Sequence, residues 1–334
     1  MSGWEPGRSC PFDYRYGAEA LNRPPEAEAE TLLVVGGLYG NPEALDAVLA
    51  LYRAEVRRAS GPVRLVFNGD CHWFDVDAAA FARINTAVAR HEAIQGNVEA
   101  ELAEASGAGC GCGYPPYVSQ ASVGCSNRIM ARLRRVAEAV PGAAERFGAW
   151  PRHRIYAVGG RRVAVIHGDP DNLAGWRLAA ESLAPADVAL RYALGCTDDP
   201  LTTPQQVRHD LLRAGVSIFA STHTCLPVLQ GYRWPGGEGA VVNNGSAGMP
   251  NFWGDPRGLI TRIGVRPSGN AEYALEVAGL HCEALPVAFD RRRWLRRFEG
   301  WWPEGSPARA AYHERIRGGP QYQAAQAIRG FAVA

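Results

Sequence analysis

The chain has 334 residues, a formal charge of +1, 47% hydrophobic residues and 21% charged residues. This composition is typical of a globular protein with a sizeable core, and it excludes disorder as the dominant state. The 35 basic residues, all of them arginine, balance 34 acidic residues, which argues against a nucleic-acid partner bound through bulk charge.

The sequence offers no signal for export or for membrane insertion. Segment 1–22 lacks the apolar centre of a signal peptide, and no run of about 18 apolar residues occurs in the chain. We therefore expect a cytoplasmic protein that does not contact a membrane. Its eight cysteines are too dilute for a disulfide scaffold, so reduced thiols are expected.

Alternating apolar patterns predict an α/β chain. After an irregular arm at 1–30, short β-branched runs predict strands, and apolar residues at a spacing of three and four predict helices. The predicted strands are 31–35, 63–67, 155–158, 162–166, 216–220, 240–242, 259–265 and 273–277. The predicted helices are 42–57, 76–93, 126–140, 143–147, 173–183 and 204–214.

One domain with an added tail is the simplest organisation. We expect a main domain over 31–285, which includes an insertion at 104–150 that opens with a Cys-, Gly-, Pro- and Tyr-rich loop. The segment 286–334 is rich in arginine and tryptophan and is expected to be mostly helical. Its Trp294 and Phe298 form an apolar stripe that would pack on the domain or on a second copy of the chain.

Polar residues follow several predicted strands directly. Asp70, Asn97, His167 and His223 each stand at such a strand end, beside or close to glycines that allow close approach. In α/β sheets, ligands bind at the carboxyl ends of the strands. A carboxylate, an amide oxygen and two imidazoles meeting there would form a site for a divalent metal ion.

The ordered set of strand-end motifs resembles the calcineurin-like metallophosphoesterase superfamily, in its small bacterial phosphodiesterase-type branch. The resemblance spans about residues 31–265. It is carried by Gly36-Gly-Leu-Tyr-Gly-Asn41, Gly69-Asp70, Gly96-Asn-Val-Glu99, His167-Gly168, Thr222-His-Thr-Cys-Leu-Pro227 and Asn243-Asn-Gly-Ser-Ala-Gly248. It implies a four-layer α/β/β/α sandwich.

The resemblance also implies two metal positions, of which one looks complete. One metal would be held by Asp70, Asn97, His167 and His223. The residues that hold the other metal in the family correspond to Gly37, Tyr39, Asp70 and Cys225 here, so only Asp70 retains a usual ligand. The second position is therefore either lost or rebuilt.

A rebuilt position would draw on unusual ligands. If the strand continues past Asp70, His72 points the same way and reaches the second metal. Cys225 as a thiolate and Tyr39 as a phenolate or a hydrogen-bond donor are further candidates, and a thiolate favours zinc or iron. We expect one or two divalent ions of manganese, iron or zinc per chain.

Three residues are candidates for work on the substrate. By the resemblance, Asn41 would donate to a phosphate oxygen. Tyr39 is a further candidate for contact with the substrate. Val98 stands where many members of the family carry a histidine that acts as the general acid, and Glu99 beside it is a candidate for carrying the proton. In the insertion loop, Tyr114 would either stack a flat group or pack rigidly.

These observations predict a metal-dependent phosphoesterase acting on a small phosphate ester, with Asp70, Asn41 and Glu99 as catalytic candidates. One alternative is a relative without catalysis that binds a metal and a phosphate-containing ligand. Another is a metal-handling or redox protein that uses its cysteines, above all Cys110, Cys112, Cys125 and Cys225.

Overall fold

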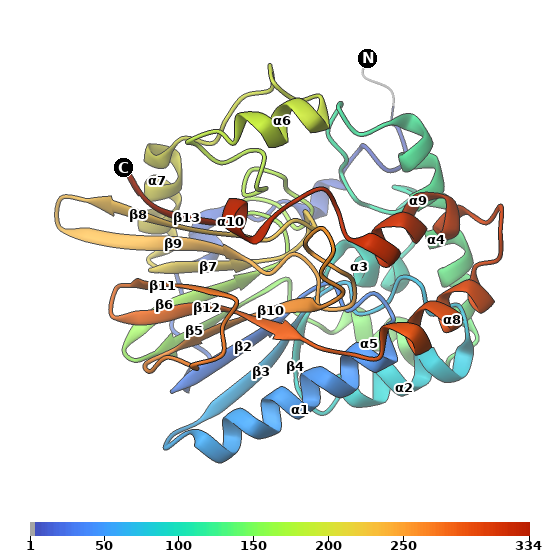
Figure 1. Ribbon diagram of the computed structural model, residues 1–334, viewed down its shortest axis with the longest axis horizontal. Helices are drawn as coiled ribbons and strands as arrows, with labels where there is room; N and C mark the ends of the chain where they lie inside the picture. The colour runs from blue at the N-terminus through green and yellow to red at the C-terminus, as the bar shows by residue number, and fades with distance from the viewer. Residues whose placement is uncertain (1–3) are drawn as a thin grey trace.

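Two β-sheets packed face to face form the centre of the molecule (Figure 1). The computed structural model describes residues 4–334. The first sheet has six strands in the order β11-β12-β10-β2-β3-β4, with bounds Tyr273–Val277, Leu280–Val287, Gly258–Gly264, Thr31–Val35, Val63–Asn68 and Glu92–Ile94. The second has seven strands in the order β1-β5-β6-β7-β9-β8-β13, with bounds Ala27–Ala29, His153–Val158, Arg161–Ile166, Ile218–Ser221, Gly237–Asn243, Val228–Trp234 and Ile328–Val333.

Alternation along the strands sorts the core into layers. On β2, Leu32 and Val34 pack between the sheets against side chains such as Val163 of β6. Leu33 and Val35 point the other way and pack with residues of α1 (Pro42–Arg58). Successive side chains of a strand face opposite sides, so one buried strand supplies two separate cores.

Helices cover the outer faces of both sheets. Helices α1 and α2 (Ala78–Val88) lie on the six-stranded sheet, and α7 (Pro204–Ala214) packs on the seven-stranded sheet, with α6 (Val188–Leu194) beside it. The four-layer α/β/β/α sandwich implied by the resemblance is confirmed. None of the helices found within residues 4–334 combines the length and apolar character needed to cross a membrane.

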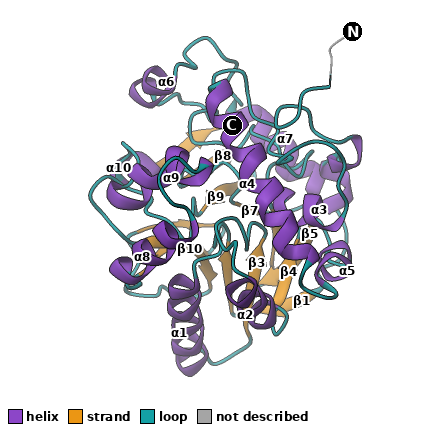
Figure 2. Ribbon diagram, turned by 90° about the vertical axis from the view of Figure 1, so that its right-hand side faces the viewer, coloured by secondary structure: helices purple, strands orange, loops and turns teal. Residues whose placement is uncertain are grey.

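Further helices gather at the end of the sandwich where the parallel strands finish (Figure 2). They are α3 (Asn97–Ala103), α4 (Gln120–Glu138), α5 (Ala143–Gly148), α8 (Arg291–Trp301) and α9 (Pro307–Gly318). Trp294 and Phe298 of α8 are buried against Phe74 of the main domain. The apolar stripe of the tail is therefore covered by the chain itself.

Some elements differ from the sequence predictions. Residues 173–183 form turns instead of a helix, because the Asp169 carboxylate accepts hydrogen bonds from the backbone N–H groups of Asp171 and Asn172 and holds the chain in a turn. The N-terminal arm contributes β1, and the tail adds the short helix α10 (Ala324–Ala327) and β13, which pairs in parallel with β8. Pairing partners distant in sequence, not local pattern, decide these two edge strands.

Candidate metal centre

The loops that follow the parallel strands of both sheets meet at one end of the sandwich. Strands β2, β3 and β4 are parallel neighbours in one sheet, and β6, β7 and β9 are parallel neighbours in the other. Glycine lets the loops touch: Gly69 has φ +74°, and a Cβ atom there would lie 2.4 Å from the backbone nitrogen of Gly96. The residues after Gly69 and Gly96, Asp70 and Asn97, are thereby brought together.

Four side chains from four loops converge in this region. The Nε2 atom of His167 lies 3.1 Å from Oδ1 of Asn97, 3.4 Å from Oδ1 of Asp70 and 3.3 Å from Nδ1 of His223. The donor atoms of Asp70, His167 and His223 all lie within 4.8 Å of one another, and all three residues are buried. The structure thus brings together the four residues expected to hold one metal.

The surroundings direct lone pairs, not protons, into the cluster. Nδ1 of His167 donates to the carbonyl oxygen of Asn68 (2.8 Å), and Nε2 of His223 donates to the carbonyl oxygen of Cys112 (2.9 Å). Burial lowers the pKa of His167 to about 4 and that of His223 to about 3, so both imidazoles are neutral at pH 7. Their inner nitrogens therefore carry lone pairs.

Asn97 and Asp70 complete this arrangement. Nδ2 of Asn97 donates to the carbonyl oxygen of Cys110 (2.9 Å), which turns Oδ1 toward His167. Oδ1 of Asp70 is buried and has no hydrogen-bond partner. Four facing lone pairs repel one another unless a cation lies between them, so this donor set fits a divalent metal ion.

Glu99 ties the loop that carries Asp70 to the loop that carries Asn97. Oε2 accepts from the backbone N–H groups of Asp70 (2.8 Å) and Gly96 (2.9 Å), and Oε1 accepts from that of Cys71 (2.9 Å). Glu99 is fully buried, and burial, followed by the charge of Asp70, raises its pKa. Both oxygens are committed to the backbone, so Glu99 orients the loops and is not placed to carry a proton to a substrate.

Asn41 does not face the centre. Its Oδ1 accepts from the backbone N–H groups of Glu43 and Ala44, both at 3.0 Å, and its Nδ2 donates to the carbonyl oxygen of Gly248 (2.9 Å). Asn41 is thus the N-cap of α1. The amide that was expected to contact phosphate is used to begin a helix and to tie it to the loop after β9.

His72 also lies apart from the cluster. Strand β3 ends at Asn68 and Asp70 has φ +52°, so the chain turns and the alternation on which the prediction for His72 rested does not apply. Nδ1 of His72 is 2.6 Å from Oδ2 of Asp75, and Nε2 is 3.3 Å from Oδ1 of Asn85. With both nitrogens engaged, His72 is part of the packing beneath the loop.

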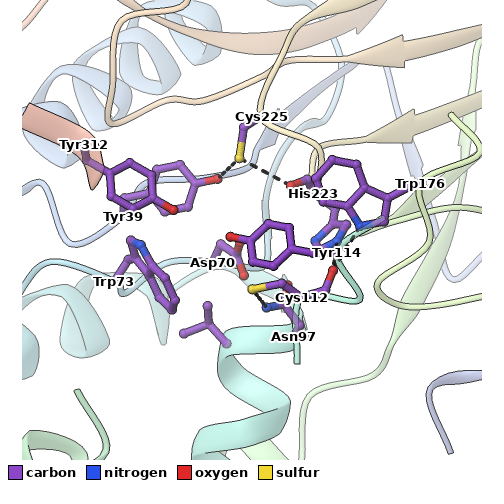
Figure 3. Close-up of a pocket in the computed structure, with 11 residues that line it drawn as sticks. Tyr39, Asp70, Trp73, Asn97, Cys112, Tyr114, Trp176, His223, Cys225 and Tyr312 are labelled. Carbon is purple, nitrogen blue, oxygen red and sulfur yellow. Dashed lines mark hydrogen bonds between the residues drawn. The ribbon is translucent and has the colours of Figure 1, made fainter. Parts of the chain in front are cut away.

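The residues at the second metal position contact each other. Oη of Tyr39 lies 2.8 Å from Sγ of Cys225, and Sγ lies 3.4 Å from the carbonyl oxygen of His223 (Figure 3). Burial is the main cause that raises the pKa of both Tyr39 and Cys225. A Cβ atom at Gly37 would lie 2.8 Å from Cε2 of Tyr39, so the tyrosine ring fills the space beside this glycine.

A small cavity of about 40 Å³ opens onto Asp70, Asn97 and His223 (Figure 3). Its other lining residues are mostly aromatic or apolar: Tyr39, Trp73, Val98, Cys112, Tyr114, Trp176, Cys225 and Tyr312. No arginine lines this cavity within residues 4–334. Asp70 supplies the one carboxylate of this lining.

The insertion and the tail both contribute to this lining. Tyr114, expected to stack a flat group or to pack rigidly, shares a hydrogen bond with Ser126 of α4 (2.9 Å). Trp176 donates its indole N–H to the carbonyl oxygen of Cys112 in the insertion (3.0 Å). Tyr312 of α9 and Trp73 were missed by sequence reasoning. Nothing local to Tyr312 signals its position, since the fold of the tail alone brings it to the centre.

The cysteines of the insertion do not form a metal cluster. Cys110 and Cys112 are buried and free, and Cys125 is half-buried on α4. Within residues 4–334, Asp70, His167 and His223 are the single group of acidic, histidine or cysteine side chains close enough to share an ion. This geometry gives no support to the cysteine-dependent alternative.

Comparison with known proteins identifies the fold through structure and not through sequence. No protein-family model matches the sequence, and no curated protein matches it significantly. A crystal structure of a hypothetical protein from Pyrococcus horikoshii OT3 is similar, with a TM-score of 0.53 and 13% identity, over 87% of this chain and 99% of that one.

Two further solved structures carry names that describe an activity. A metallophosphoesterase from Sphaerobacter thermophilus is 13% identical, with a TM-score of 0.49, over 87% of this chain and 100% of that one. A protein serine/threonine phosphatase from Saccharomyces cerevisiae is 16% identical, with a TM-score of 0.39, over 82% and 88%. At such identities the likeness concerns the fold alone: the chain shares its fold with the protein from Pyrococcus horikoshii OT3.

Proposed function

We propose that this protein is a metal-dependent phosphoesterase whose cation is held by Asp70, Asn97, His167 and His223. The observation that supports this proposal is the convergence of four donor atoms at one buried point, with Oδ1 of Asp70 lacking any partner. The names of the structural neighbours agree with this class of reaction.

A bound divalent cation supplies a water molecule of lowered pKa and neutralises charge on a phosphoryl oxygen. Asp70 contributes the negative charge that attracts the cation, and the carbonyls of Asn68 and Cys112 hold the two imidazoles with a lone pair facing inward. Glu99 keeps Asp70 and Asn97 in register through their loops.

Neither of the two positions considered for a general acid supplies one. Val98 lies in the cavity wall where a histidine acid would stand, and Glu99 is committed to the backbone. We therefore expect turnover of esters whose leaving group departs without a proton, such as nitrophenolate, and slow turnover of alkyl esters. The small, aromatic lining favours a small ester over a nucleotide.

The test is hydrolysis by protein loaded with manganese, iron or zinc. Nitrophenyl phosphate esters should be hydrolysed by the wild type. Asp70→Asn should lose stoichiometric cation binding and all but about a thousandth of its hydrolysis. Asp46→Asn, an exposed carboxylate on α1, is the matched control and should retain both. Equal hydrolysis by wild type and Asp70→Asn would refute the proposal.

A second candidate is a protein that binds a cation and a phosphate-containing ligand without turnover. Two observations favour it: Asn41 is turned away from the cavity, and the wall contains Val98. This alternative predicts cation binding that depends on Asp70 and tighter phosphate binding when the cation is present. It also predicts no hydrolysis of any ester in the series.

A further inference from the structure

The second metal position is filled by protein. The ring of Tyr39 lies where a side chain at Gly37 would project, with 2.8 Å from the Cβ position to Cε2 and 3.2 Å to Oη. Tyr39 is 4% exposed and packs against Phe74, so the ring has little freedom to leave. A cation there would have to displace a buried aromatic side chain.

The polar atoms at this position already satisfy one another. At 2.8 Å, Oη of Tyr39 and Sγ of Cys225 are at direct hydrogen-bond distance. Two ligands on one tetrahedral zinc ion would be about 3.6 Å apart, given metal–oxygen and metal–sulfur distances of about 2.1 and 2.3 Å. The hydroxyl and the thiol therefore bind each other and leave no space between them for an ion.

The thiol has a second partner that also disfavours a metal. Sγ of Cys225 donates to the carbonyl oxygen of His223 at 3.4 Å, so its proton is in use, and the phenolic proton of Tyr39 is left for the bond to sulfur. Arg315 of α9 donates to the carbonyl oxygen of Cys225 (2.6 Å). It places a permanent positive charge next to this position.

We propose that the hydrogen-bonded chain from Tyr39 through Cys225 to the His223 carbonyl closes the second metal position, so that the centre holds one cation. This inference rests on the metal site of the proposed function and adds the number of cations.

The test counts cations and needs no variant. Protein reconstituted with zinc or cobalt and freed of excess ion should hold one ion per chain. The cobalt form should lack a thiolate-to-cobalt charge-transfer band, because the Cys225 sulfur stays a thiol. Two ions per chain, or such a band that disappears in Cys225→Ala, would overturn the inference. Cys282→Ala, a buried thiol outside the cavity, is the matched control.

Hydrolysis separates this inference from the proposed function. If no nitrophenyl ester is hydrolysed but the protein holds one ion per chain, the proposed activity fails and the inference stands. If such an ester is hydrolysed only by protein that holds two ions per chain, the proposed activity stands and the inference fails.

Discussion

The two halves of this centre lie on neighbouring loops and differ in where their polar atoms point. In one half, the backbone takes up the outer nitrogen of each histidine and leaves lone pairs of His167 and His223 facing Asp70. In the other half, the side chains of Tyr39 and Cys225 take up each other. A cation site thus depends less on the number of polar groups than on whether their neighbours leave lone pairs free.

The largest effect should come from removing the charge of the first half. Asp70→Asn keeps the shape of the side chain but removes the carboxylate that attracts the cation. We expect loss of stoichiometric cation and a fall in kcat/KM of about a thousandfold, equivalent to about 4 kcal/mol. Metal analysis after dialysis and steady-state kinetics measure the two effects. Retention of one tightly bound cation would mean that the two halves do not differ as described.

The next effect should come from loosening the loops of the first half. Glu99→Gln replaces a carboxylate that accepts from three backbone N–H groups by an amide whose NH₂ must face at least one of them. Cation affinity should fall by about 10- to 100-fold, as is usual when a residue that orients metal ligands is changed. Calorimetric titration with zinc measures it. Glu104→Gln, exposed at the end of α3, is the control and should leave the affinity unchanged.

The pH dependence of cation binding should reveal which of the four donors carries a proton. Burial raises the pKa of Asp70 to about 7, whereas burial lowers the pKa of His167 to about 4 and that of His223 to about 3. A proton on Asp70 competes with the cation, so the affinity should fall tenfold per pH unit below pH 7 and level off above it.

Down to about pH 4, the histidines should add nothing to this slope. Calorimetry in buffers with different ionisation enthalpies should find close to one proton released per cation at pH 6. Release of two or three protons would show that the imidazoles are charged in the free protein. The lone pairs that distinguish the first half would then be absent.

The smallest effect on the centre is expected for His72. His72→Ala should leave the cation content at its wild-type value, because both ring nitrogens bind Asp75 and Asn85. It should lower the free energy of unfolding by about 3 kcal/mol, since it leaves a buried carboxylate without its partner. Denaturant unfolding measures this loss, with His281→Ala on β12 as the control. Loss of the cation in His72→Ala would make His72 part of the second half after all.

The four donors were predictable because each follows a strand whose apolar pattern is clear, and parallel strands bring their ends together. The roles of Asn41 and Glu99 were not predictable in this way. A side chain after a strand can serve a ligand or a nearby backbone N–H group, and here α1 and the loop at Asp70 provide such groups. The pattern gives the position of a residue but not the direction of its polar atoms.

The contribution of the tail to the cavity lining could not be predicted from the sequence for another reason. Tyr312 reaches the cavity because α9 packs on α4, and β13 joins β8 from almost a hundred residues away. The helix predicted at 173–183 failed for a local cause, since Asp169 competes for the backbone N–H groups. Long-range pairing and side-chain competition are both invisible to periodicity.

Backbone conformation at the centre carries a consequence for engineering. Tyr39, Asp70 and Cys225 all have positive φ, at 53°, 52° and 64°, where L-residues other than glycine pay about 1 kcal/mol or more each. Glycine in place of Asp70 would relax the chain and remove a buried carboxylate oxygen that has no partner, so it would raise the melting temperature while destroying the cation site. Selecting variants for heat resistance alone would therefore favour the loss of Asp70, and the surviving variants would be more stable but inactive.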